Sequence, residues 1–148
     1  MPKSVYVLEP QAIFIAELSR IVAAAGGRVA RIAQSMDIAE IASLRVDYAL
    51  LDLDYAAGGV LDGLTFFRGA APKVKLIVLT EQRDFSRLAR YRDAGATAIL
   101  PKAMSGDELC CALRETFERG AHRVFYDGPM RETAQAVRAE YIFVDERA

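Results

Sequence analysis

The chain has 148 residues, 53% of them hydrophobic and 26% charged, and 19 Lys and Arg against 20 Asp and Glu give a formal net charge of −1. This composition is typical of one folded domain with a short extra segment, and it excludes both a disordered chain and a dedicated, strongly basic nucleic-acid binder. No apolar run reaches the roughly 18 residues that span a bilayer, the N-terminus lacks a signal core, and the two adjacent cysteines indicate neither a disulfide framework nor zinc, so we expect a cytoplasmic protein.

Short apolar runs alternate with stretches in which apolar residues recur at helical spacing. Glycines follow three of the predicted helices, at a position that favours a residue tolerant of positive φ. Capping boxes open two predicted helices, those at 37–44 and 105–119. The predicted elements, in chain order, are strand 5–8, helix 14–25, strand 28–33, helix 37–44, strand 48–52, helix 63–68, strand 74–79, helix 84–94, strand 97–100 and helix 105–119. Residues 53–62 are predicted to form a loop.

Strands that are continuously apolar are buried on both faces, as in a parallel sheet covered by helices. We therefore predict an α/β fold, a doubly wound five-stranded parallel sheet with helices on both faces, over residues 1–120. Residues 121–148 are predicted to form a short C-terminal extension without a recognisable output domain, in which 122–126 and 141–144 could be extended and 131–140 could be a helix. The apolar segment 141–144 is expected to pack on the domain or on a second copy.

Four functional side chains follow or end separate predicted strands. These are Glu9, Asp52, Thr80 and Lys102. In a doubly wound sheet such positions meet beyond the carboxyl ends of the strands. Two carboxylates attract a divalent cation that prefers oxygen, and a carboxylate can attack phosphorus to form an acyl phosphate. The lysine and the hydroxyl are suited to contact phosphoryl oxygens.

Over roughly residues 4–119 the sequence resembles the receiver domain of two-component response regulators, a flavodoxin-like fold, and is closest to receivers of the LuxR/FixJ type. The resemblance rests on VYVLEPQAIF, DYALLDLD, the Asp62-Gly63 pair, KLIVLT, GATAILPK and SGDEL. It implies that Asp52 is the phosphoacceptor, that Thr80 is the switch hydroxyl and that Lys102 takes the lysine position. Glu9 matches the first member of the acidic pair that holds Mg²⁺.

Three departures from the family pattern make the resemblance one to an atypical receiver. Pro10 replaces the second acid of the pair, Ile99 stands at the aromatic switch position, and the loop after Asp52 is long, with the sequence YAAGGVL. Loss of a unit charge about 4.5 Å from a divalent ion forfeits roughly 2 kcal/mol in a water-like dielectric, and roughly 7 kcal/mol at an effective dielectric of about 20. Weak Mg²⁺ binding is therefore expected, with Glu9, Asp52 and Asp54 as ligands if the loop turns Asp54 inward.

Two functional hypotheses remain open. The first is a single-domain response regulator that a histidine kinase or a phosphotransfer protein phosphorylates on Asp52, with output through a downstream protein partner. The second is a pseudo-receiver, a phosphorylation-independent interaction or dimerisation module in which a homodimer is an open alternative. Neither involves direct DNA or membrane binding, and neither is an enzyme beyond phosphoryl transfer to Asp52. A cofactor carrier is disfavoured, because residues 9–13 contain no phosphate-cradling glycine.

Overall fold

The computed structural model describes residues 1–119 and 123–124. Its elements are β1 (Lys3–Leu8), α1 (Ala12–Ala24), β2 (Gly27–Ala33), α2 (Ile38–Ala42), β3 (Tyr48–Asp52), α3 (Gly59–Ala70), β4 (Lys75–Thr80), α4 (Phe85–Asp93), β5 (Ala96–Pro101), α5 (Gly106–Arg119) and β6 (Arg123–Val124). The predicted helix at 131–140 and the predicted extended segment at 141–144 lie outside the described residues. Within that description, no helix has the length and apolar character needed to cross a bilayer.

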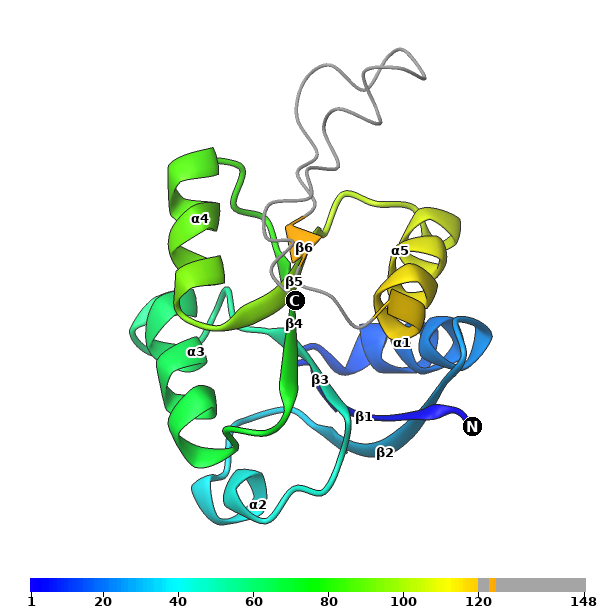
Figure 1. Ribbon diagram of the computed structural model, residues 1–148, viewed down its shortest axis with the longest axis horizontal. Coiled ribbons are helices and arrows are strands. Elements are labelled where there is room, and N and C mark those ends of the chain that lie inside the picture. Colours follow the sequence, from blue (N-terminus) through cyan, green and yellow to red (C-terminus); the bar gives the residue numbers. More distant parts are fainter. Residues whose placement is uncertain (120–122, 125–148) are drawn as a thin grey trace.

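All paired strands of the sheet are parallel, and the strand order is β2-β1-β3-β4-β5-β6. Helices α1 and α5 cover one face, and α2, α3 and α4 cover the other (Figure 1). The predicted doubly wound fold is thereby confirmed. The chain runs from β1 outward to β2 and then returns to the other side of β1 as β3, so the winding direction reverses between β1 and β3. A crevice outside their carboxyl ends is the usual ligand site of such sheets.

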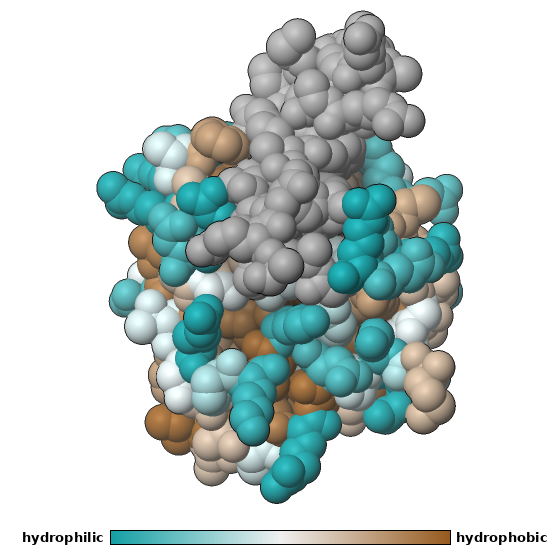
Figure 2. Space-filling model, viewed as in Figure 1, coloured by the Kyte–Doolittle hydropathy of each residue, from teal (hydrophilic) through white to brown (hydrophobic). Residues whose placement is uncertain are grey.

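The core consists of two apolar clusters, one on each face of the sheet, because successive side chains of a strand point to opposite sides. In β3, Leu50 belongs to the cluster under α1 and α5, and Leu51 to the cluster under α3. A ring pair marks each cluster, Tyr6 with Phe67 and Tyr48 with Phe117. The face in Figure 2 shows hydrophilic residues interspersed with apolar ones over its described part. The continuous apolar runs of the sequence therefore reflect burial on both faces.

Helix α3 begins at Gly59 rather than at the predicted residue 63, so the loop after β3 is shorter than expected. The glycine pair causes the difference. Gly58 and Gly59 have φ angles of 81° and 86°, values that glycine adopts without a Cβ penalty, and they turn the chain directly into the helix. Asp62 in the first turn supports this early start through the helix dipole.

A two-residue strand, β6, extends the sheet past the five predicted strands. Arg123 and Val124 pair in parallel with Ala98 and Ile99 of β5. This strand belongs to the predicted C-terminal extension and lies within the stretch predicted to be extended at 122–126. A run of two residues is too short to give a strand signal of its own, because periodicity needs about four or more residues.

Candidate functional site

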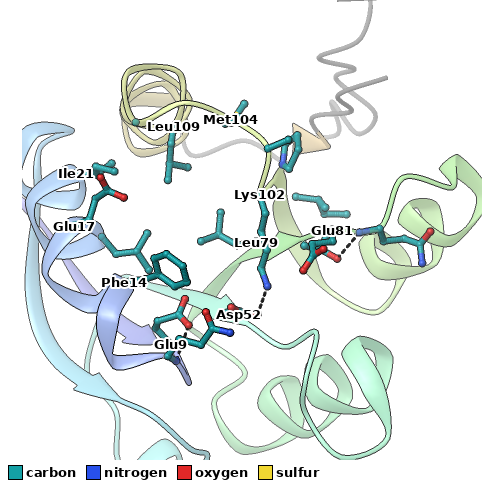
Figure 3. A pocket seen from close by; sticks show the side chains of 18 of the residues that line it. Glu9, Phe14, Glu17, Ile21, Asp52, Leu79, Glu81, Lys102, Met104 and Leu109 are labelled. Atoms are coloured by element: carbon teal, nitrogen blue, oxygen red, sulfur yellow. Dashed lines mark hydrogen bonds and ion pairs between the residues drawn. The ribbon is translucent and has the colours of Figure 1, made fainter. Parts of the chain in front are cut away.

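Parallel register brings the four predicted residues to one edge of the sheet. Asp52 and Thr80 are the last residues of β3 and β4, and Glu9 and Lys102 directly follow β1 and β5. Asp52 pairs with Leu79 and Thr80 pairs with Pro101, so the strand ends are almost level. Glu9, Asp52 and Thr80 are all buried. Figure 3 shows Glu9 and Lys102 on either side of Asp52, at the mouth of a cavity.

Lys102 joins two carboxylates. Its Nζ lies 2.8 Å from Asp52 Oδ1 and 2.9 Å from Asp54 Oδ2, and the Tyr55 ring lies under the ammonium with its centroid 5.1 Å away. Burial by itself lowers the pKa of Lys102, but the hydrogen bonds and charges of Asp52 and Asp54 outweigh burial and raise it. The lysine is therefore a fixed cation at the sheet edge.

Glu9 is a buried carboxyl beside a second carboxyl. Burial raises the pKa of Glu9, the N–H that Gln11 donates to Oε2 over 2.9 Å lowers it, and the charge and hydrogen bonding of Asp52 raise it further. The net direction is upward. A raised pKa with an acidic neighbour is the electrostatic signature of a carboxylate pair without a cation between its members.

The sequence left open whether the Asp54 side chain turns inward, and the structure shows where it lies. Its Oδ1 accepts the Thr80 hydroxyl over 2.7 Å, and its Oδ2 accepts the Glu81 backbone N–H over 2.9 Å in addition to Lys102. Its own N–H donates to Asp52 Oδ1 over 3.3 Å. The loop therefore does turn Asp54 inward, but toward Thr80 and Lys102. The Thr80 hydroxyl is aimed at Asp54 rather than at the predicted phosphoacceptor.

Of the three predicted Mg²⁺ ligands, only the carboxylates of Glu9 and Asp52 are placed to bind the ion together. Among the described residues no three acidic, His or Cys side chains gather to hold a metal, so the expected set of Glu9, Asp52 and Asp54 is not assembled. Pro10 contributes no side-chain ligand, and its carbonyl accepts from the Gln34 amide. Mg²⁺ is commonly held by one or two carboxylates, with water and phosphate oxygens completing its shell. Glu9 and Asp52 satisfy that minimum.

An open cavity of about 640 Å³ lies over this edge of the sheet. Its polar end carries Glu9, Asp52 and Lys102, and its apolar part extends toward α1 and α5, where Phe14 and Met104 line it (Figure 3). Phe14 is 46% exposed. This volume is within the usual range for ligand sites, and Asp52 is among the residues that line it.

Ile99, which stands at the aromatic switch position, is fully buried. It belongs to the same cluster as Leu88 and Tyr91 of α4. Its side chain also borders the cavity over the sheet edge, between α4 and the carboxyl ends of the strands.

Replacing Glu9 by Gln should stabilise the metal-free protein near neutral pH. The pKa of Glu9 is raised in the folded chain. As the pH rises from the ordinary 4.5 through that raised pKa, the unfolded state releases this proton first, and the free energy of unfolding falls. The Glu9→Gln variant escapes this loss. We expect a gain on the order of 1 kcal/mol at pH 7, because the amide removes the burial penalty of the carboxylate and its repulsion by Asp52, and no gain at pH 4.

Urea unfolding in EDTA at both pH values measures this effect. Glu17→Gln is the matched control, because Glu17 is a mostly exposed acid on α1 that pairs with Arg20 on the same helix surface. A Glu9→Gln variant that is no more stable than the parent at pH 7 would show that the carboxylate pair is not strained.

Comparison with known proteins supports the receiver fold and nothing narrower. No family model and no curated protein sequence matches the chain. Solved structures do. A LuxR-family two-component response regulator from Aurantimonas sp. SI85-9A1 has a TM-score of 0.71 at 16% identity, over 95% of this chain and 96% of that one. A response regulator from Thermotoga maritima has a TM-score of 0.67 at 18% identity, over 80% and 99%.

The isolated receiver domain of RcsB from Salmonella enterica serovar Typhimurium, solved with the phosphomimetic BeF₃⁻, has a TM-score of 0.68 at 16% identity, over 84% of this chain and 94% of that one. These likenesses confirm the predicted resemblance to receiver domains at the level of the fold. At such identities the chemistry has to be argued from the residues themselves.

Proposed function

We propose that the chain is a response-regulator-type signalling protein that accepts a phosphoryl group on Asp52. The observation that carries the proposal is the buried Asp52 carboxylate at the point where the winding of the sheet reverses, with Lys102 2.8 Å from one oxygen and Glu9 on the other side. A nucleophile, a cation and a second acid in one crevice are the parts that phosphoryl transfer to a carboxylate requires.

The reaction would proceed by attack of an Asp52 oxygen on the phosphorus of the donor, in line with the leaving group. One P–O bond forms to Asp52, and the bond to the donor breaks, leaving an acyl phosphate. Lys102 would stabilise the negative charge on the transferred oxygens and orient Asp52. Mg²⁺ bound by Glu9 and Asp52 would neutralise further charge on those oxygens, with weaker affinity than a site that has a third acid, because Pro10 supplies none.

The proposed partners follow from this chemistry. The phosphodonor is a histidine kinase or a phosphotransfer protein, whose phosphohistidine can enter the cavity over Asp52. The output is altered binding to a downstream protein, in the cytoplasm. Solved structures with this fold include receivers with the phosphomimetic BeF₃⁻ and a Burkholderia pseudomallei response regulator with a phosphorylated aspartic acid and a calcium ion.

The Asp52→Asn substitution should abolish phosphorylation of the chain by acetyl phosphate. We expect that acetyl phosphate with Mg²⁺ adds one phosphoryl group to the native chain, seen as intact mass, and adds none to the Asp52→Asn variant, because the amide cannot attack phosphorus. Asp93→Asn is the matched control, since Asp93 is an exposed acid at the far end of α4. Equal labelling of the native chain and the Asp52→Asn variant would reject Asp52 as the acceptor.

A phosphorylation-independent interaction module is the second candidate. Two specific observations favour it. Pro10 stands where the family has an acidic ligand, and the Thr80 hydroxyl donates its hydrogen bond to Asp54. A chain that acquires no label at millimolar Mg²⁺, while a partner binds equally to the native protein and to the Asp52→Asn variant, would select this candidate over the first.

A further inference from the structure

The Asp54 carboxylate is an anion held by donors from two other strand ends. Thr80 Oγ1 donates to Oδ1, while the Glu81 N–H and Lys102 Nζ donate to Oδ2, all within 2.9 Å. The Asp54 side chain is only 14% exposed. Three convergent donors, one of them charged, form a small anion pocket next to Asp52, and Asp54 fills it from within the chain.

A phosphoryl group on Asp52 would need the same donors. It carries three strongly accepting oxygens and about two negative charges, and Lys102 already touches both Asp52 and Asp54. The Thr80 hydroxyl and the Glu81 N–H have one proton each, so neither can serve Asp54 and a phosphoryl oxygen at full strength. The negative charges of the Asp54 carboxylate and of a phosphoryl group on Asp52 would also repel each other at this short distance.

We propose that the Asp54 carboxylate acts as an internal stand-in for the phosphoryl group, occupying its pocket in the unmodified protein and leaving when Asp52 is modified. The identity of the incoming group rests on the proposed function, whereas the occupied anion pocket does not. Asp54 is in this view a regulatory residue, which sets how readily the site accepts its modification.

Departure of Asp54 would also release the loop that carries it. Tyr55 follows Asp54 directly, its hydroxyl donates to the Glu81 carboxylate over 3.3 Å, and the Lys102 ammonium lies over its ring. The segment between β3 and α3 is thus docked on the segment between β4 and α4 through Asp54 and Tyr55. Thr80 in turn accepts the Gln82 N–H over 3.0 Å. Phosphorylation would therefore separate the two loops, and the Thr80 hydroxyl would exchange one anion for another.

The experiment is a titration of the full chain with beryllium fluoride in the presence of Mg²⁺, followed by amide NMR spectra. The proteins are the native chain, Asp54→Ala, Asp54→Asn and the control Asp93→Ala, which removes one acidic charge away from the site. We expect Asp54→Ala to reach half-saturation at a beryllium fluoride concentration at least about tenfold lower than the native chain does, because the Thr80 hydroxyl and the Glu81 N–H no longer donate to a carboxylate. Asp54→Asn should fall between them, because it keeps an acceptor but loses the charge.

A second measurement does not depend on Asp52 chemistry. Without ligand, the Glu81 amide of Asp54→Ala should move upfield and exchange faster than in the native chain, and added formate, a free carboxylate, should restore its position. The same tests in an Asp52→Asn background should give the same amide changes. The Asp93→Ala control should show none of them.

The outcomes separate this inference from the proposed function. Equal half-saturation in the native chain and in Asp54→Ala overturns the inference and leaves Asp52 as acceptor. Failure of every variant to bind beryllium fluoride, together with formate-reversible release of the Glu81 amide, rejects the proposed function and supports the internal anion. If Asp54→Ala leaves the chemical shift of the Glu81 amide unchanged, or if formate does not restore that shift, the inference is overturned, whatever the result of the beryllium fluoride titration.

Discussion

Lys102→Met should destabilise the protein by about 3 kcal/mol, because it leaves two carboxylates without their cation. Removing one partner of a buried ion pair typically costs about 3–5 kcal/mol. Only 4% of the Asp52 side chain is exposed while Lys102 is in place, so the ion pair is largely buried on the Asp52 side. The Lys102 side chain is itself 22% exposed, and Asp54 is 14% exposed, which places the expected loss at the lower end of the range.

The pH dependence identifies the cause of this loss. The pKa of Lys102 is raised above its ordinary 10.5 in the folded chain, so the ammonium stabilises the fold at all pH values below 10.5, and this contribution disappears as the pH rises through the raised pKa. The stability difference between the native chain and the Lys102→Met variant should therefore be constant near neutrality and shrink above pH 10.5.

Urea unfolding monitored by circular dichroism measures both statements. Lys73→Met is the matched control, since Lys73 is exposed in the turn before β4 and its replacement should leave the free energy of unfolding nearly unchanged. If the two methionine variants proved equally stable, the ion pairs at the strand ends would have no structural role.

Phe67→Ala should cost about 3–5 kcal/mol, the usual loss for a fully buried phenylalanine. The Phe67 ring is completely enclosed and lies 5.7 Å from the Tyr6 ring, centroid to centroid. It fixes α3 against β1, and α3 is the helix that the Asp54 loop leads into. Truncation leaves a cavity in a closely packed cluster, whose neighbouring side chains can close it only in part.

Phe14→Ala provides the comparison, because the same deletion is made at a position that is 46% exposed. The loss in free energy of unfolding for Phe14→Ala should be well under half of the loss for Phe67→Ala, as measured by the same urea unfolding with linear extrapolation. Similar losses at the two positions would mean that the cluster under α3 is not the tightly packed layer described above.

The fold was predictable from the sequence because its strands are apolar on both faces. Runs such as Ala49–Leu51 and Leu76–Leu79 admit no solvated side, which leaves a parallel sheet between helix layers as the natural solution. The start of α3 was not predictable in the same way. Gly58 and Gly59 are typical of a loop, and only the positive φ angles that they adopt reveal a tight entry into the helix.

The meeting of Glu9, Asp52, Thr80 and Lys102 at one edge follows from strand ends alone, and the structure brings Lys102 to Asp52 and Asp52 to Glu9. The role of Asp54 does not follow. Alternation along a strand indicates the face of the sheet to which the Asp54 side chain points. Its hydrogen-bond partners, however, are set by the course of the following loop and by donors at the ends of β4 and β5. Those are tertiary contacts, which a pattern of period two does not encode.

Strand β6 has a practical consequence for anyone who trims the chain. All six residues of β5 are buried, and Arg123 and Val124 pair with its outer side. A protein cut after Arg119 would present an unpaired, apolar outermost strand, the kind of template on which copies of a chain stack into aggregates. Shortened versions intended for crystallisation or spectroscopy should therefore retain Val124, and insolubility of a shorter one would reflect a bared strand rather than a failed fold.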